Sequence, residues 1–479
     1  MLSGAAKSHQ SVLAIPQSLA QWQSEPGQVI SWKPCASSLE SFARAEIVDI
    51  PPSHQQEQHL LSFQARHTKK TDFERLIIVR WQLPGHCDIK SLTDAIHFHL
   101  HSHDTYHSWL SMGEDKAITR RLLDNPATIK LEPCHEGWMN AEELITHIAQ
   151  TPPPTEWGCF QIGIIQTTHF FTLYACIDHL YTDSFLIPIL HQDLVTSYKL
   201  LTHGAGILGT ERSSYLDYCK QQRAFTDGLS PDHPLMAQWL EILKQWNGAL
   251  PIFPLALGEI NHEDPAVMQS LSLFNSVESL AVQKAFKQER IPFVFGLMSA
   301  LAVVEHQLTG KQEAGFLTPI STRKSKSDQN TLGWYTGVVP CQAALGSRPW
   351  SDVARDLQAS FKRNRALADL PLECVLTRAT TDDIADSGHQ MGYMVSYMDT
   401  SFPPLHGDFS NQYWQNNSSV FMNVGSSSQV ALWFTRSPSG LSVTASHPNT
   451  TQAVTSILGL VAEVRIHCLE LSHRASTRS

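Results

Sequence analysis

Short apolar runs and helical stripes alternate along this chain of 479 residues without a fixed strand–helix–strand order. The clearest pattern is a hairpin, with one strand predicted over 160–166 and a more apolar strand returning over 169–177. A helical stripe follows, in which apolar residues recur every three or four positions. Its members are Phe185, Ile189, Leu190, Leu194 and Leu201. The hairpin therefore carries the polar segment 178–184 to the start of a helix.

The remaining pattern predicts a mixture of helices and strands on both sides of this hairpin. Before it, helices are predicted over 51–60, 91–103 and 140–150, and strands over 73–83 and 129–131. After it, helices are predicted over 215–225, 234–246, 277–287, 293–304, 351–361 and 452–471. Strands are predicted over 268–274, 314–317, 394–398, 419–424, 430–435 and 441–445. This order is typical of an α+β fold with two sandwiches of mixed sheet and flanking helices.

The length of the chain exceeds what one small core can organise, so we expect two to four domains or two large lobes. Residues 1–28 lack periodicity and are expected to form an N-terminal arm. The Gly-rich, aperiodic stretch 206–214 is the expected boundary between lobes. The prediction is thus an N-terminal lobe over 29–205 and a C-terminal lobe over 206–479.

Composition excludes several classes of function. The net charge is −10 with histidines neutral, which argues against a nucleic-acid partner. Nine scattered cysteines form no Cys-x-x-Cys pair, so they suggest free thiols in a reducing cytoplasm. The N-terminus does not resemble a signal peptide, and the apolar run 293–304 is too short to span a bilayer. We expect a cytoplasmic protein, with peripheral contact at the inner membrane face left open.

The candidate chemistry centres on His179 and Asp183, the single His-x-x-x-Asp among the 24 histidines. An imidazole placed at the end of a strand, in a tight polar loop, is a candidate general base. The alternative is a core histidine that is hydrogen-bonded to the backbone. Histidine pairs one helical turn apart, His97 with His101 and His99 with His103, can bind zinc. No cysteine or carboxylate at diagnostic spacing completes such a site, so we expect no metal.

Several longer stretches make a resemblance specific. The loop Asp178-His179-Leu180-Tyr181-Thr182-Asp183-Ser184 resembles the His-His-x-x-x-Asp-Gly motif of the condensation-domain and chloramphenicol-acetyltransferase-like superfamily. The chain resembles most closely the mycobacterial polyketide-synthase-associated (Pap-type) trehalose acyltransferases. The stretches that carry this resemblance are 52–60, 103–106, 177–179, 333–340 and 395–399.

The resemblance implies two chloramphenicol-acetyltransferase-like lobes that form a V with a central tunnel and meet near His179. It implies that His179 is the general base and that Asp183, the second residue of the catalytic motif, pairs with an arginine that fixes the loop. Arg323 is the candidate partner, and Asp178, in place of the first histidine, is expected to support the loop. Ser184 replaces the glycine, which would strain the loop if positive φ were needed there. Trp334 and Tyr335 are candidate tunnel-lining residues, with core packing as the alternative.

The function implied by the resemblance is O-acyl transfer. A long fatty or polyketide acyl group would move from CoA or a carrier-bound thioester to a hydroxyl of trehalose or a trehalose derivative, without a covalent acyl-enzyme or a cofactor. One alternative is condensation onto an amine or another lipid alcohol. Another is a non-catalytic domain that docks a polyketide synthase or a membrane lipid exporter, and both proteins are also possible partners of the enzyme.

Overall fold

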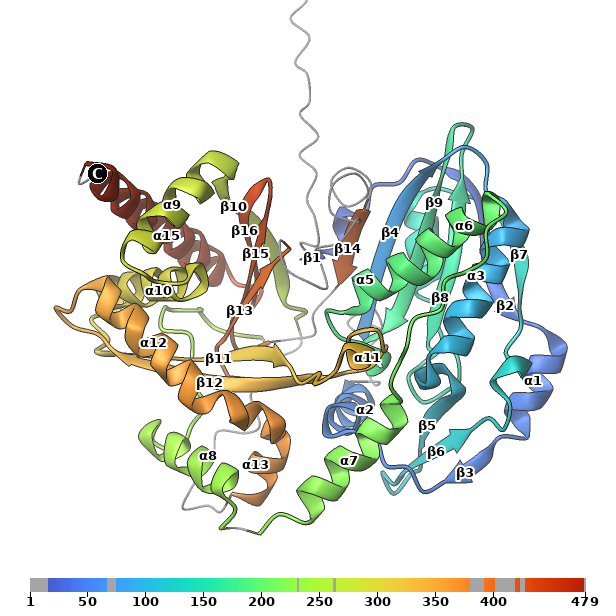
Figure 1. Ribbon diagram of the computed structural model, residues 1–479, viewed down its shortest axis with the longest axis horizontal. Coiled ribbons are helices and arrows are strands. Elements are labelled where there is room, and N and C mark those ends of the chain that lie inside the picture. Colours follow the sequence, from blue (N-terminus) through green and yellow to red (C-terminus); the bar gives the residue numbers. More distant parts are fainter. Residues whose placement is uncertain are drawn as a thin grey trace, which may run out of the picture.

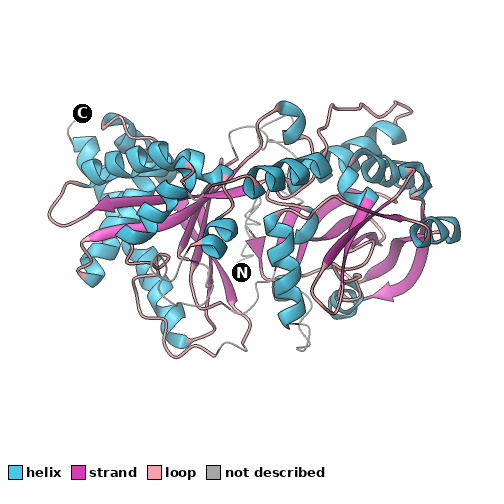
Figure 2. Cartoon of the chain, turned by 90° about the horizontal axis from the view of Figure 1, so that it is seen from below, coloured by secondary structure: helices cyan, strands magenta, loops and turns pink. Residues whose placement is uncertain are grey.

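The computed structural model describes residues 16–66, 75–230, 232–261, 264–379, 392–400, 418–422 and 427–477. Two lobes lie side by side and diverge as a V, with the N-terminal lobe in blue to green and the C-terminal lobe in yellow to red (Figure 1). In each lobe, helices pack against a mixed sheet (Figure 2). The α+β class predicted from the sequence is confirmed.

A seven-stranded sheet forms the N-terminal lobe, in the order β1-β14-β4-β9-β8-β2-β7. Its strands are β1 (Pro16–Gln17), β2 (Gly27–Pro34), β4 (Leu76–Pro84), β7 (Leu131–Met139), β8 (Phe160–Gln166), β9 (Phe170–Asp178) and β14 (Ser418–Met422). The β8–β9 hairpin predicted from the sequence lies at its centre. All neighbours in this sheet are antiparallel except β1 and β14.

Strand β14 comes from the C-terminal half of the chain but completes the N-terminal sheet. It pairs with β4 over five residues, and its Phe421 is fully buried (Figure 1, red strand beside β4). Part of the expected arm is also ordered here, because β1 pairs with β14 and Trp22 stacks on Phe421 at 4.9 Å. Residues 1–15 of that arm lie outside the described ranges. The division at residue 206 therefore assigns β14 to the wrong sheet.

The other elements of the N-terminal half cover this sheet. A small sheet holds β3 (Glu46–Val48), β6 (Ile118–Leu122) and β5 (Ser108–Met112). The helices are α1 (Ala36–Ala43), α2 (His54–Arg66), α3 (Ile89–Ser102), α4 (Ala141–Ile148), α5 (Leu186–Leu190) and α6 (Ser197–Thr202). Short 3-10 turns are η1 (Leu19–Gln21), η3 (Asp104–His107), η4 (Pro126–Thr128) and η5 (His179–Tyr181). A π-helical turn, η6 (His191–Thr196), joins α5 to α6.

The C-terminal lobe has a six-stranded sheet in the order β10-β16-β15-β13-β11-β12. Its strands are β10 (Val267–Asn275), β11 (Glu313–Ser321), β12 (Thr336–Ala344), β13 (Met394–Asp399), β15 (Ala431–Ser437) and β16 (Gly440–His447). Its helices are α7 (Tyr215–Asp227), α8 (Pro234–Gln245), α9 (Ser276–Gln288), α10 (Phe293–Thr309), α11 (Lys326–Gln329), α12 (Trp350–Asn364), α13 (Leu372–Arg378) and α15 (Thr451–Thr477). A 3-10 turn, η7 (Arg365–Asp369), follows α12.

Apolar burial explains why these segments form strands and helices. In β9 every residue from Phe171 to Asp178 is buried, which fits a continuous apolar run at the centre of a sheet covered on both faces. Most of α10 is buried in the C-terminal core. No single helix within the described ranges is long and apolar enough to cross a bilayer; α9 and α10 reach that threshold only together, across a bend of 94°.

Polar side chains join the two lobes along their seam. The carboxylate of Asp104, from the N-terminal lobe, accepts hydrogen bonds from the Ser214 hydroxyl and from the N–H groups of Tyr215 and Leu216. It therefore caps α7, the first helix after the lobe boundary, and a negative charge at a helix N-terminus is favourable. Figure 1 shows α7 at the bottom of the molecule, beneath the junction of the lobes.

Candidate functional site

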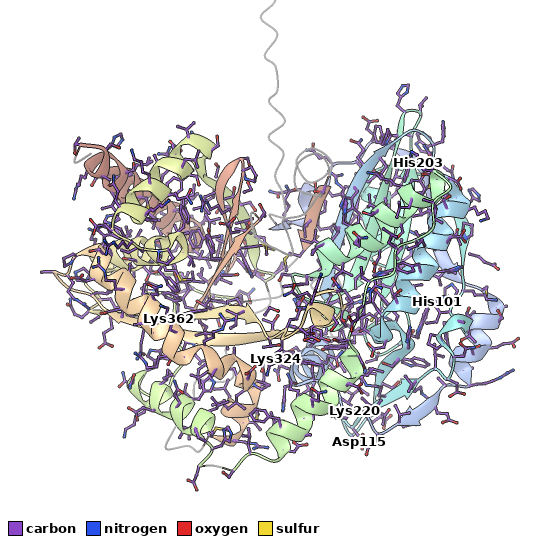
Figure 3. The ribbon with its side chains drawn as sticks, in the orientation of Figure 1. His101, Asp115, His203, Lys220, Lys324 and Lys362 are labelled. Carbon is purple, nitrogen blue, oxygen red and sulfur yellow. The ribbon has the colours of Figure 1, made fainter. Side chains whose placement is uncertain are left out.

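The central strand β9 ends at the candidate base. Asp178, its last residue, lies opposite Leu76 of β4, and its side chain accepts a hydrogen bond from Leu180 N–H. Aspartate is a preferred cap for a helical turn, and this bond starts the 3-10 turn η5 at His179. Ser184 is exposed and is not among the positive-φ residues, so replacement of the motif's glycine causes no strain. In Figure 3, Lys324, the chain neighbour of Arg323, marks the junction of the lobes where this loop lies.

His179 is held neutral by its surroundings. Burial, and after it the electrostatic influence of neighbouring His59, lowers the pKa of His179 to about 4. Its Nδ1 atom is fully buried and faces its own main-chain carbonyl, so we assign the proton to Nδ1. The ring as a whole is partly exposed, which leaves Nε2 with its lone pair as the accessible nitrogen. A neutral imidazole with an accessible lone pair can accept a proton at pH 7.

Asp178 connects the motif loop to two side chains from other elements, Arg75 and His59. Its Oδ2 accepts a hydrogen bond from Arg75 Nη1 at 2.7 Å, and its Oδ1 accepts one from His59 Nε2 at 2.8 Å. Burial alone would raise the pKa of Asp178, but His59, Arg75 and the Leu180 N–H outweigh burial and hold it below its ordinary value. Asp178 is therefore a buried carboxylate. Its hydrogen bonds hold the start of the motif loop, the position in which a loop support is expected.

The ion pair expected between Asp183 and Arg323 is present and joins the two lobes. Arg323 Nη1 donates to Asp183 Oδ2 at 2.5 Å, and the same oxygen accepts the N–H of Tyr335 at 2.9 Å. The guanidinium lies between the rings of Phe185 and Tyr335, with its carbon 4.1 and 4.4 Å from the two ring centres. Only a planar guanidinium can stack in this way, so lysine would not replace it. The partners of Asp183 are thus a guanidinium and a main-chain N–H of the other lobe.

The two candidate tunnel residues have different environments. The indole of Trp334 is partly exposed, and its ring centre lies 4.0 Å from that of His179. Tyr335 is 2% exposed and packs against Tyr215 and Tyr218. Trp334 therefore lies against the candidate base, whereas Tyr335 is packed in the core, the alternative that the sequence left open.

A buried network fixes the loop that carries Trp334. The N–H of Leu332 donates to His103 Nδ1, and His103 Nε2 lies 2.8 Å from a carboxylate oxygen of Asp193. His99 Nδ1 also bonds to Asp193, and Arg212 pairs with it at 2.5 Å. Nearby, a Cβ on Gly333 would lie 2.2 Å from the ring of Tyr215, so only glycine allows this approach.

The same network bears on metal binding. His99, His103 and Asp193 offer ligand atoms within 4.8 Å of one another, a carboxylate that the sequence spacing did not reveal. However, His103 Nδ1 accepts the Leu332 N–H, so its proton is on Nε2, the atom that a metal would need. The three side chains are better explained as a hydrogen-bonded anchor. The other pair lies away from the junction. His97 accepts a hydrogen bond from the Leu131 N–H, His101 bonds to the Ile129 carbonyl, and His101 lies out in the N-terminal lobe (Figure 3).

Sequence reasoning missed the side chains that support the base from distant segments. His59 and Arg75 converge on Asp178 from more than 100 residues away in the chain. Gln56, also on α2, donates to the Leu180 carbonyl at 3.0 Å. His59 and Gln56 lie in the 52–60 stretch that carried the resemblance, but no local spacing links them to the His179 loop.

The fold and this site define a class of protein. A family model described as "Condensation domain" matches residues 49–429, and the chain belongs to this family. The first condensation domain of the calcium-dependent antibiotic synthetase has the same fold, with a TM-score of 0.68, 14% identity, and coverage of 89% of this chain and 97% of its own.

Closer relatives are acyltransferases, and this chain is an acyltransferase too. Acyltransferase PapA3 of Mycobacterium tuberculosis is 28% identical over 448 residues, which cover 93% of this chain and 94% of the relative. Trehalose-2-sulfate acyltransferase PapA2 of Mycobacterium bovis is 30% identical over 448 residues, covering 93% and 95%. A solved structure of PapA2 acyl transferase superposes with a TM-score of 0.89 at 29% identity, covering 95% of this chain and 99% of that one.

Proposed function

We propose that this acyltransferase moves a long-chain fatty or polyketide acyl group from a thioester to a hydroxyl of trehalose or a trehalose derivative. The printed names of PapA2 and PapA1, the latter a 2'-acyl-2-O-sulfo-trehalose (hydroxy)phthioceranyltransferase, support a trehalose-type acceptor. The donor is CoA or a carrier protein of a polyketide synthase. The site observation that carries the proposal is a neutral, partly exposed His179 at the junction of the lobes, beneath Trp334.

The proposed reaction needs one base and no covalent intermediate. Nε2 of His179 accepts the proton of the sugar hydroxyl as its oxygen attacks the thioester carbonyl. The new C–O bond forms, the C–S bond breaks, and the imidazolium returns its proton to the departing thiolate. Such general base catalysis is typically worth about 10²–10⁴ in rate. Asp183, Arg323 and Asp178 act by holding the loop in place.

The test is mass spectrometry of the purified protein with palmitoyl-CoA and either trehalose or trehalose 2-sulfate. The wild-type protein should form an acyl sugar and release CoA, and His179→Ala should lose both by at least about 10². His203→Ala is the matched control, because His203 is exposed at the end of α6, far from the junction (Figure 3). Full activity of a folded His179→Ala variant would refute the role of His179 as base.

The alternatives give different results in the same assay. Transfer to an added amine or lipid diol, but not to either sugar, would favour the condensation-type reaction. Absence of both CoA release and product with the wild-type protein, together with binding to a polyketide synthase or a lipid exporter, would favour a docking domain. The expected cytoplasmic location, with peripheral contact at the inner membrane face left open, stays a prediction, which cell fractionation can test.

A further inference from the structure

The indole of Trp334 lies directly against the imidazole of His179. Their ring centres are 4.0 Å apart, and the ring planes are tilted by 40°. Aromatic pairs ordinarily keep their centres about 4.5–7 Å apart, so this contact is a close one. The imidazole of His59 also approaches Trp334, but at 5.8 Å and nearly at a right angle. Of the two imidazoles, therefore, that of His179 packs on the π system of the indole.

The loop that carries Trp334 is held by main-chain hydrogen bonds on both sides. The N–H of Leu332 donates to a ring nitrogen of His103 at 3.1 Å. The N–H of Tyr335 donates to the carboxylate of Asp183 at 2.9 Å. A tryptophan side chain has only two torsion angles, so fixing its backbone leaves little freedom to the indole. The indole is thus preorganised against the candidate base.

His179 must become positively charged during the proposed reaction. Its Nε2 takes the proton of the attacking hydroxyl while Nδ1 keeps its own, so the charge spreads over the whole ring. Burial opposes this charge, because burial is the largest of the influences that lower the pKa of His179. An interaction that stabilises the imidazolium more than the imidazole would lower the barrier to proton transfer.

Among the described residues, no carboxylate is hydrogen-bonded to His179. The charged or titratable groups that face it are Asp178 and Asp183 from the motif loop and His59 from α2. Each of the two carboxylates is paired with an arginine, and both raise the pKa of His179 less than burial lowers it. In a Ser–His–Asp triad, a carboxylate bound to the imidazole stabilises the imidazolium. This site lacks that bond within the part of the chain that the structure describes.

From these contacts we propose that Trp334 is a positioning residue, which holds the imidazole of His179 in place and stabilises its positive charge during proton transfer. The face of an indole has a negative electrostatic potential, and tryptophan is the aromatic side chain that attracts cations most strongly. The contact therefore favours the imidazolium over the neutral ring, and its effect should appear in the rate of the chemical step. This inference rests on the proposed acyl transfer.

Fluorination of one tryptophan tests the effect of charge with little change of shape. Fluorine withdraws electron density from the indole face, so tryptophans with one, two and three fluorines at position 334 should weaken the contact stepwise. We expect the single-turnover rate of acyl transfer from palmitoyl-CoA to trehalose to fall with each fluorine, by about 2- to 30-fold in total. The acceptor concentration that gives half the maximal rate should not change. The same series at Trp81, which meets His191 edge-on at 6.1 Å, is the matched control and should have no effect.

Ordinary substitutions provide a second measurement. Trp334→Phe keeps a weaker π face and Trp334→Leu keeps only apolar bulk, so the rates should decrease in the order Trp, Phe, Leu. Melting temperatures check the fold of each variant. Because the indole favours the charged ring, its loss should lower the pKa of His179, and the acid limb of kcat/KM in Trp334→Leu should not rise above pH 4. An indole that only shields the base from water predicts the opposite, a limb that moves toward pH 6.5.

The outcomes distinguish this inference from the proposed function. Rates that do not depend on the number of fluorines, beside an inactive His179→Ala, would overturn the role of Trp334 and leave the acyl transfer intact. Equal rates in Trp334→Phe and Trp334→Leu, or an acid limb that rises in the latter, would also overturn it, because both indicate bulk alone. A change only in the half-saturating acceptor concentration would make Trp334 an acceptor-binding residue instead. An active His179→Ala enzyme would refute the proposed base, and this inference with it.

Discussion

Asp178 and His179 are neighbours in the chain, yet their surroundings favour opposite charge states. Asp178 meets a guanidinium, an imidazole and a main-chain N–H, all of which stabilise its anion. His179 is buried beside the imidazole of His59, and its surroundings favour its neutral form. This difference separates a buried carboxylate from the proposed base within one dipeptide.

The lowered pKa of His179 predicts an unusual acid limit for activity. A base is lost as pH falls through its own pKa, so kcat/KM should stay nearly constant from pH 7 to 5.5 and decline near pH 4. A histidine with an ordinary pKa would instead give an acid limb of the pH–rate profile near pH 6.5. His59→Gln should move the limb to higher pH, because the electrostatic influence of His59 contributes to the low value. Initial rates of CoA release across pH provide the measurement, and a wild-type limb near 6.5 would contradict the prediction.

The Asp183–Arg323 pair predicts a loss of stability rather than of chemistry. In Asp183→Ala, the guanidinium of Arg323 stays buried between two rings without its carboxylate, which should cost about 3–5 kcal/mol of unfolding free energy. Urea denaturation measures this cost. Asp356→Ala is the control, because the Arg348–Asp356 pair lies on the surface and should matter little. A stable but inactive Asp183→Ala enzyme would instead indicate a direct chemical role.

At the scale of elements, the apolar sequence predicts the helix α10, but it does not predict that the carboxyl group of Glu305 is buried in the core. The helix extends to Thr309, and Gly310 ends it in the left-handed conformation at φ 73°. Glu305 lies inside the core, where its carboxylate accepts a hydrogen bond from the Tyr393 hydroxyl at 2.7 Å. Burial raises the pKa of Glu305 to about 7.

This shift predicts how stability depends on pH. The unfolded chain releases the proton of Glu305 near pH 4.5, whereas the folded protein keeps it to about pH 7. Stability due to this group is therefore complete below pH 4.5 and falls as pH rises to 7, by roughly 3 kcal/mol at most. Glu305→Gln should remove this part of the slope in urea titrations at pH 5, 6, 7 and 8. Exposed Glu313→Gln should not, and equal slopes in wild type and Glu305→Gln would contradict the assignment.

Elements with weak or interrupted patterns escaped prediction. β7 is an edge strand with alternating exposed residues, and it contains Pro133 and Gly137, so the sequence indicated only 129–131. β2, α1 and the small sheet were likewise not predicted. The helix expected after Phe185 is continuous in pattern, but the structure interrupts it with the π-helical turn η6. The spacing of apolar residues does not reveal whether main-chain hydrogen bonds follow the α-helical or the π-helical pattern.

On the scale of the whole molecule, the site depends on contacts that no local pattern contains. His179 and Asp183 are found by spacing and Arg323 by resemblance, because motif residues are close in sequence. His59 and Arg75 act from other elements, and only the folded sheet brings them to Asp178. Sequence could therefore identify the candidate base and its loop, but not His59 and Arg75, which hold that loop from other elements.

The insertion of β14 predicts that a substitution late in the chain weakens the first lobe. Phe421→Ala should remove a fully buried ring that stacks on Trp22, at a cost of about 3–5 kcal/mol. Hydrogen exchange should then accelerate in β4 and around Trp22, more than in β15 and β16. Faster exchange confined to the C-terminal sheet would contradict this coupling. Leu458→Ala, on an exposed face of α15, serves as the control.

Strand β14 also determines when the N-terminal sheet can be completed during synthesis. The N-terminal sheet has its central strand once residue 178 has been made, but the edge of β4 stays open until β14 appears about 240 residues later. At a synthesis rate of about 5–20 residues per second, the ribosome needs roughly 10–50 s to close this gap. During that time an apolar strand edge is exposed to other nascent chains. The strand that connects the two lobes therefore leaves the edge of β4 exposed during synthesis, when it must be kept from pairing with other chains.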